Sequence, residues 1–233
     1  MENNEKVTIV VNSCDLYEDT WEPFLKLFSI QWPDCPYKIV LNTETKVYTG
    51  KTLPVTTINT KKGISWSARM KKVAKQINSE YIMFFLDDEF LRSPVNVKAF
   101  EDTIEYMDNN KDVGYILMRH SEKQKSEFAQ PYFPRAEITD DFQIVGLSAL
   151  YRKDFMLKIL RNHESVWEYE LYATKRMKRY PYKVLQYNKN MPMIFDYDDS
   201  TKTGYGVHKR KWLKATKPLL DSFGIEVKIE NEK

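Results

Sequence analysis

The chain has 233 residues, of which 42% are hydrophobic and 30% are charged, and its formal net charge is +3 at pH 7. This length allows one large domain or two small ones, and the composition is that of a soluble globular protein. The small net charge does not indicate a nucleic-acid partner. Cys14 and Cys35 have neither metal-ligand spacing nor the pattern of a disulfide framework, which favours a reducing, cytoplasmic location. The N-terminus carries no secretion signal, and no apolar run is long enough to cross a membrane.

Strands and helices alternate along the first half of the chain. Short apolar or β-branched runs predict strands at residues 7–11, 37–41, 54–58, 81–86 and 113–118. Apolar residues at helical spacing predict helices at 21–30, at 66–77 behind a Ser65 cap, and from Pro94 to Met107. This alternation predicts a single α/β domain, with a mostly parallel, Rossmann-like sheet flanked by helices on both faces.

The second half of the chain is less regular. Residues 119–142 have no clear period, and a loop of that length in a compact domain is either functional or disordered. Strand-like sequence returns after it, followed by alternating helical and strand-like segments. The predicted elements are a strand at 142–151, helices at 153–160 and 167–178, a strand at 182–187, a loop at 196–206, a basic helix at 209–220 and a strand at 225–229. No repeat or linker divides the chain, so residues 1–118 and 119–233 are expected to be halves of one domain.

Three adjacent acids, Asp87, Asp88 and Glu89, directly follow an uninterrupted apolar run. Such a run is typical of a strand buried on both faces, whereas three ionised carboxylates cannot lie unpaired in the core. We therefore expect them at the carboxyl edge of the sheet, where open α/β folds bind their ligands. The polar residues 12–15 and 42–44 end two other predicted strands and should converge on the same edge. Clustered carboxylates there suit a divalent cation bound with a phosphate, and the alternative is a solvated acidic turn.

The segment around this acidic run resembles GT-A-fold glycosyltransferases of the family 2 type. In that family a Gly-x-Ser-x-Ala-Arg helix start is followed by a Glu-Tyr-Ile strand entry and an Asp-x-Asp motif. The matching residues here are Gly63, Ser65, Ala68, Arg69, Glu80, Tyr81, Ile82, Asp87, Asp88 and Glu89. The chain is particularly similar to bacterial capsule and surface-polysaccharide glycosyltransferases, over residues 7–91 and more loosely over 142–171. It departs from the family in having Glu89 where Asp is usual and Met70 where Asn is usual.

The resemblance implies a nucleotide-sugar site in residues 1–118. The implied donor-binding residues are Asn12, Asp15, Asn42, Lys62, Arg69 and Asp87. Asp87 is assigned to the ribose and Glu89 to Mn²⁺ or Mg²⁺, and Asp88 can serve either role. Arg69 and Lys62 are candidates for the donor diphosphate, while the three remaining residues would line the base and ribose pocket. A solvated surface cation at Lys62 and plain turn formation by the Asn and Asp residues are open alternatives.

The resemblance also implies that residues 119–233 bind the acceptor. Glu170 is favoured as the general base of an inverting transfer and Glu168 is the alternative, because a base in this family lies at a helix start after the acceptor strand. Both acids could instead only stabilise the helix dipole. His208 is a candidate third metal ligand. The basic residues after it could close on the diphosphate or rest on an anionic membrane, and a solvated face is the simpler alternative.

These features predict a metal-dependent, inverting glycosyltransferase of surface-polysaccharide synthesis. The expected donor is a nucleoside-diphosphate sugar, with UDP as the first candidate, and the expected acceptor is a glycan or a lipid-linked sugar. We expect the enzyme in the cytoplasm, with peripheral contact to the inner membrane as an additional hypothesis. A sugar-nucleotidylyltransferase is less favoured, because NSCDLYED follows the first strand where a Gly-rich, Arg-containing phosphate loop would be needed. A non-catalytic module that binds nucleotides or sugars remains the alternative from another class.

Overall fold

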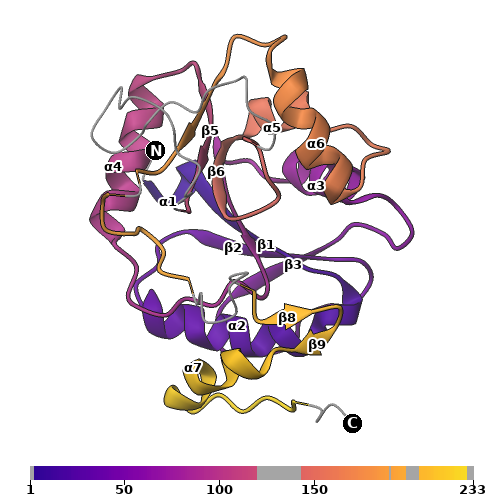
Figure 1. The fold of residues 1–233 in the computed structure, drawn as a ribbon, viewed down its shortest axis with the longest axis vertical. Helices are drawn as coiled ribbons and strands as arrows, with labels where there is room; N and C mark the ends of the chain where they lie inside the picture. The colour runs from indigo at the N-terminus through magenta and orange to yellow at the C-terminus, as the bar shows by residue number, and fades with distance from the viewer. Residues whose placement is uncertain (1–2, 120–142, 189, 198–204, 230–233) are drawn as a thin grey trace.

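The computed structural model describes residues 3–119, 143–188, 190–197 and 205–229. They form one α/β domain around a seven-stranded sheet with the strand order β3-β2-β1-β4-β6-β5-β7 (Figure 1). The strands are β1 (Val7–Asn12), β2 (Lys38–Thr43), β3 (Val55–Asn59), β4 (Tyr81–Leu86), β5 (Val113–Leu117), β6 (Ala149–Arg152) and β7 (Lys183–Gln186). Pairing in this sheet is parallel except at β6, which runs antiparallel to both β4 and β5. The expected fold class is therefore confirmed.

The two central strands are apolar on both sides because helices cover both faces of the sheet. Every residue of β1 and the first five residues of β4 are buried. Successive side chains of a strand point to opposite faces. Ile9 and Met83 accordingly belong to one core cluster, and Val10 and Phe84 belong to the other.

The helices divide between these two clusters. The first face carries α2 (Glu18–Gln31) and α4 (Val97–Asn109), and the second carries α3 (Trp66–Gln76), α5 (Lys153–Ile159) and α6 (Val166–Met177). A short α1 (Asn3–Lys6) precedes β1, and a 3₁₀ turn η1 (Asp15–Tyr17) precedes α2. No helix in the described part of the chain is long and apolar enough to cross a membrane.

Side-chain caps set the helix starts. Ser65 accepts a hydrogen bond from the Ala68 backbone N–H at 3.1 Å, as its predicted role as the cap of α3 requires. Helix α4 begins at Val97, three residues later than the predicted start at Pro94. The N-cap explains the difference. The Asn96 side chain accepts from the Ala99 N–H at 3.2 Å, so Asn96 is the N-cap residue and the first helical residue is Val97.

The C-terminal part differs most from expectation. The predicted basic helix at 209–220 is wrong over its first half, where β8 (Val207–His208) and β9 (Lys211–Trp212) form a hairpin. Its two-residue turn has φ of 49° at Lys209 and 66° at Arg210, and positive φ at both positions is what a type I′ turn requires. A 3₁₀ turn η2 (Lys214–Thr216) and helix α7 (Lys217–Ser222) follow.

Two predicted strands are also corrected. Residues 225–229 are extended, but they pair with no strand among the described residues, so the predicted last strand is wrong. The strand predicted at 142–151 is confirmed only at β6, because residues 143–148 form a loop in which Gly146 is pressed against Val166. Residues 120–142 and 198–204, which hold most of the two predicted loops, lie outside the described residues.

Candidate functional site

The predicted convergence of polar residues at the carboxyl edge of the sheet is confirmed. Asn12 is in register with Asn42 on β2 and with Leu86 on β4, so the three strands end side by side. The Asn42 amide donates to Asn12 Oδ1 at 2.7 Å, and the Thr60 hydroxyl donates to Asn42 Oδ1 at 3.0 Å. These bonds fix the orientation of both amides beside the acidic run.

Asp15 joins the loop after β1 to the loop after β2. Its Oδ1 accepts hydrogen bonds from three consecutive backbone N–H groups, those of Glu44, Thr45 and Lys46, at 3.1, 3.0 and 3.1 Å. Burial alone would raise the pKa of Asp15, but the bonds from the Thr45 side chain and from these backbone groups outweigh it and lower the pKa to about 2. The Asp15 carboxylate thus holds the two loops together. Contact between Asp15 and a nucleotide-sugar donor stays a prediction.

Arg69 also holds loops together. Its side chain is buried, and its guanidinium donates from Nε to the Thr60 hydroxyl at 3.1 Å and from Nη2 to the Ser13 carbonyl. Arg69 therefore ties the loop after β1 to the end of β3, next to the acidic run. Lys62 is exposed on the turn between Lys61 and Gly63, and no described residue pairs with it, which fits the surface-cation alternative.

Asp87 is buried under hydroxyl groups. Its carboxylate accepts from the Thr20 hydroxyl at 2.7 Å and from the Ser13 hydroxyl, which in turn accepts from the Trp21 indole N–H at 2.6 Å. Burial raises the pKa of Asp87 to about 6, against the lowering effect of the Ser13 and Thr20 bonds. Ser13 belongs to the polar segment 12–15 that the sequence predicts at this edge, without a role of its own. Thr20 and Trp21 are not predicted there, since a hydroxyl and an indole in a helix carry no distinctive spacing.

Glu89 is fully buried and makes an ion pair inside the protein. Its Oε1 accepts from Arg119 Nη1 at 2.6 Å, and its Oε2 accepts from the Leu86 backbone N–H at 3.0 Å and from the Ser148 hydroxyl. The Arg119 guanidinium lies over the Tyr197 ring at 4.7 Å from its centroid. Both carboxylate oxygens of Glu89 thus have protein donors.

Asp88 differs from its two neighbours. It is 8% exposed, and no described cation lies in ion-pair contact with its carboxylate. Burial raises its pKa to about 8, and the charges of Asp87 and Glu89 add to the effect. Its backbone carbonyl accepts from the Gly206 N–H at 2.9 Å, which ties the C-terminal hairpin to the acidic run. A buried, crowded carboxylate without a cationic partner is the environment that a bound cation would satisfy.

A complete metal cage is not present among the described residues, where no three His, Cys, Asp or Glu side chains are arranged around one point. Mg²⁺ is commonly held by one or two carboxylates, with water and substrate phosphates as the other ligands. Asp88 fits that pattern. His208 lies exposed on β8, two residues after the Gly206 that is bonded to Asp88.

The two candidate bases have different environments on α6. Glu168 is exposed and forms a capping box with Ser165, whose backbone N–H and hydroxyl both donate to its Oε2 at 2.8 Å. These Ser165 bonds lower the pKa of Glu168. Glu170 is half-buried and accepts from the Gly146 N–H at 2.8 Å, and burial raises its pKa. A raised pKa brings a carboxylate closer to the range that suits a general base.

Tyr205 is joined to the acidic run through the next residue, Gly206, whose N–H donates to the Asp88 carbonyl, and no sequence pattern singles this tyrosine out. It directly precedes Gly206 and is half-buried. Burial raises the pKa of its hydroxyl to about 12, and the charges that act on it are those of Glu89, Arg119, Glu170 and Asp88. The loop before β6 connects Glu170 to the acidic run, because the Gly146 N–H donates to Glu170 at 2.8 Å and the Ser148 hydroxyl donates to Glu89. No sequence pattern could have predicted Tyr205 as a site residue, because only the tertiary position of the hairpin brings it close to the acidic run.

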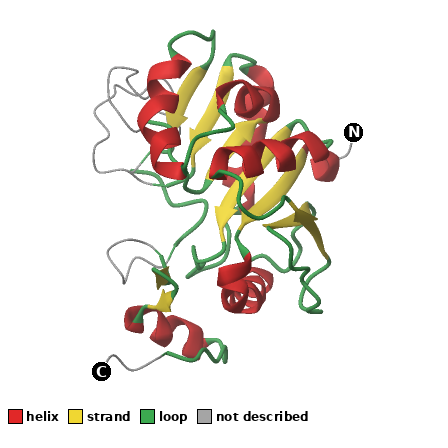
Figure 2. Cartoon of the chain, turned by 90° about the vertical axis from the view of Figure 1, so that its right-hand side faces the viewer, coloured by secondary structure: helices red, strands yellow, loops and turns green. Residues whose placement is uncertain are grey.

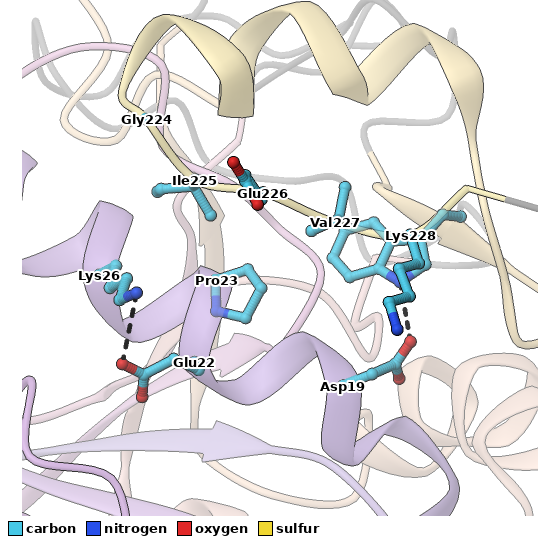
Figure 3. A pocket seen from close by; sticks show the side chains of 10 residues that line it. Asp19, Glu22, Pro23, Lys26, Gly224, Ile225, Glu226, Val227 and Lys228 are labelled. Atoms are coloured by element: carbon cyan, nitrogen blue, oxygen red, sulfur yellow. Dashed lines mark hydrogen bonds and ion pairs between the residues drawn. The ribbon is translucent and has the colours of Figure 1, made fainter.

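The C-terminal hairpin is fixed against α2. The Trp212 indole N–H donates to Asp19 at 2.7 Å, and its ring stacks on Phe90 with centroids 5.7 Å apart and planes at 15°. A cavity of about 480 Å³ lies beyond it, between α2 and residues 224–228 (Figure 3). None of the predicted site residues lines this cavity, so it is separate from the candidate site.

No protein-family model and no curated protein matches the sequence. Solved structures do match: TarS residues 1–349 of S. aureus, alone and in complex with UDP, each give a TM-score of 0.53 at 15% identity over 82% of this chain. The chain spans 59% of the length of those TarS chains. A cytidylyltransferase from Leptospira borgpetersenii gives a TM-score of 0.50 at 12% identity over 94% of both chains. At these identities the similarity establishes a shared fold and nothing finer.

Proposed function

We propose that the protein is a glycosyltransferase that uses a nucleoside-diphosphate sugar as donor. The observation that carries the proposal is the arrangement of Asp88 and Glu170. Asp88 is buried at the carboxyl edge of the sheet, and Glu170 is half-buried and accepts from the Gly146 N–H. The same loop connects the two, because its Ser148 hydroxyl donates to Glu89, the neighbour of Asp88. Asp88 is suited to hold a cation that stabilises the leaving diphosphate, and Glu170 is suited to accept the proton of the acceptor hydroxyl.

Asn12, Asn42 and Asp87 are proposed to receive the base and ribose, since their polar groups are already oriented by bonds to one another and to nearby hydroxyls. Asp88, with His208 as a further candidate, would hold Mn²⁺ or Mg²⁺ together with the donor diphosphate. When bound, the ion supplies positive charge that stabilises the departing diphosphate. Glu89 would act indirectly by holding Arg119, a fixed cation at the same edge.

Glu170 is proposed to accept the proton of the acceptor hydroxyl. The hydroxyl oxygen then forms the new bond to the anomeric carbon, the bond from that carbon to the diphosphate breaks, and the nucleoside diphosphate leaves with the electron pair. Attack opposite the leaving group inverts the anomeric centre. The Gly146 N–H keeps the carboxylate oriented for this step. The UDP complex of TarS supports uridine as the first donor to test.

The acceptor is proposed to be a glycan or a lipid-linked sugar of a surface polysaccharide. Peripheral contact with an anionic membrane is part of the same proposal. It is supported by the basic hairpin and the residues that follow it, which include Lys209, Arg210, Lys211, Lys214 and Lys217.

A nucleotidylyltransferase is the second candidate, because a cytidylyltransferase shares the fold. The products distinguish the two reactions. With a panel of nucleoside-diphosphate sugars and Mn²⁺, a glycosyltransferase releases a nucleoside diphosphate. With a nucleoside triphosphate and a sugar phosphate, a nucleotidylyltransferase releases pyrophosphate. Release of pyrophosphate alone would overturn the proposal, and binding of nucleotide without release of either product would favour a non-catalytic module.

A further inference from the structure

The extended segment 225–229, with the sequence IEVKI, has unpaired backbone groups. The Ile225 N–H donates to the Leu220 carbonyl at 2.9 Å and ends the helix α7. Beyond that bond, the backbone of residues 226–229 makes no hydrogen bond with any other residue in the described ranges. An extended chain with free donors and acceptors is a template for pairing with another strand.

The position of the segment leaves it accessible. It lies at the periphery of the molecule, beyond the hairpin and next to α7, in both orthogonal views (Figures 1 and 2). Residues 224–228 also line one side of the cavity of about 480 Å³, which α2 borders on the other side (Figure 3). The candidate site is at the carboxyl edge of the sheet, so pairing of this segment does not depend on the proposed reaction.

The side chains alternate as they do in a strand with one face on a core. Ile225 is 4% exposed, and Val227 packs against the core cluster that contains α2. Glu226 and Lys228, which alternate with these two residues, are exposed. Neither forms an ion pair with another described residue. The polar face of the segment therefore carries one acid and one base at a spacing of two residues.

This charge pattern is self-complementary. In an antiparallel pair of identical segments centred on Val227, Glu226 lies directly opposite Lys228 of the partner subunit, and the two-fold symmetry repeats the same pair. Ile225 lies opposite Ile229 of the partner subunit on the other face. Opposite charges directly across an antiparallel pair stabilise it, and like charges destabilise it. A register shifted by two residues would lose this match.

We propose that residues 225–229 form a symmetric antiparallel strand pair with the same segment of a second copy of this chain. Two-stranded pairing alone is marginal in water, so the dimer is a weak one that depends on protein concentration and on salt. Both ion pairs contribute in each dimer, so one substitution per chain changes two contacts.

The first experiment is sedimentation velocity of the full chain over a concentration series at low salt. The wild-type protein is expected to shift from monomer to dimer. Glu226→Lys and Lys228→Glu each place like charges opposite each other in both pairs, and each is expected to weaken the dimer at least tenfold. Lys51→Glu, an equivalent charge reversal at another exposed lysine, is the matched control and leaves the dimer unchanged. Thermal unfolding of every variant checks that the fold is retained.

The second experiment mixes the two single variants. A Glu226→Lys strand carries two bases and a Lys228→Glu strand carries two acids, so the two variants are complementary to each other although neither pairs with itself. The mixture is expected to form a heterodimer, and the double variant Glu226→Lys/Lys228→Glu is expected to recover the wild-type dimer. A monomeric wild type, a dimer indifferent to both single changes, or a mixture that stays monomeric would each overturn the proposal. None of these outcomes bears on nucleotide binding, so the proposed function is tested separately.

Discussion

The three adjacent carboxylates after β4 have three different environments. Asp87 is bonded to the hydroxyls of Ser13 and Thr20, and Glu89 is paired with Arg119. Asp88 is nearly as buried but pairs with no described cation, and a bond from the Val207 backbone does not offset the effect of burial on its pKa. Residues that look equivalent in sequence thus divide into two whose side chains are held by hydroxyl or guanidinium donors and one that has no such side-chain partner among the described residues.

Replacement of Asp88 and Glu89 should have opposite effects on stability. Burial makes the Asp88 carboxyl harder to ionise in the folded protein than in the unfolded chain, so at neutral pH its ionisation favours unfolding. Asp88→Asn cannot ionise, so the metal-free variant should unfold at a higher temperature and lose any stabilisation by Mn²⁺. Glu89→Gln leaves the Arg119 charge without its partner, and breaking a buried pair in this way costs about 3–5 kcal/mol. Thermal unfolding with and without Mn²⁺ measures both. A Glu89 variant as stable as the wild type would contradict the structural role of the ion pair.

Glu170 and Glu168 form a matched pair for testing the base. Glu170→Gln should lower kcat by roughly 10²–10⁴, the usual contribution of a general base, with donor affinity little changed. Glu168→Gln should leave kcat near the wild-type value, because Glu168 caps the helix and is exposed. If the Glu168 variant is the inactive one, the assignment of the base is wrong.

The pH dependence of the reaction tests the same assignment. Burial raises the pKa of Glu170, and only the deprotonated carboxylate can accept a proton. The rate should therefore fall as the pH drops through this raised pKa, and the fall should begin at a higher pH than for an ordinary glutamate. The acid limb of the pH–rate profile should disappear in Glu170→Gln and persist in Glu168→Gln.

At the scale of elements, the C-terminal hairpin holds two of the three non-glycine residues with positive φ in the described part of the chain. Lys209 and Arg210 both have positive φ, a conformation that non-glycine residues adopt at an energetic cost. With this turn, the Gly206 N–H donates to the Asp88 carbonyl and the Trp212 ring stacks on Phe90. Tertiary contacts at both ends of the hairpin therefore compensate for unfavourable turn residues.

A turn with better residues should stabilise the protein. Lys209→Asn together with Arg210→Gly supplies the preferred type I′ sequence and should raise the free energy of unfolding by about 1–2 kcal/mol. Urea denaturation measures the change. Lys51→Asn together with Lys214→Asn, which removes the same two positive charges outside the turn, is the control and should not stabilise. A decrease in stability for the double variant would show that the two basic side chains make contacts that outweigh the backbone strain.

At the scale of the whole molecule, nucleotide binding is expected to raise the unfolding temperature of the protein. A ligand that binds only the folded state stabilises it by about 2.7 kcal/mol at a hundredfold excess over Kd. In a thermal-shift panel with Mn²⁺, one or two of UDP, GDP, CDP, ADP and dTDP should therefore give a clear increase, and the increase should shrink without metal. A flat panel would contradict a nucleoside-diphosphate donor.

The sequence alone determined the elements whose signals are local. Apolar runs predicted β1 and β4. Because neighbouring parallel strands end at the same edge, the polar residues at the strand ends, Asn12, Asn42 and the acidic run, were predicted to lie together there. Capping residues such as Ser65 marked the helix starts within a few residues. The fold class followed from the alternation of these elements.

Only the tertiary structure decided which of these residues are free to act. The Glu89–Arg119 pair, the clamping bonds of Arg69 and the position of Tyr205 join residues that are far apart in the chain, and no periodicity records such partners. The basic helix predicted at 209–220 is wrong over its first half, where Lys and Arg, although good helix formers, lie in the hairpin. Its turn forms because contacts with Asp88, Phe90 and Asp19 over-determine it. Local sequence sets which structures are accessible, and long-range packing selects among them.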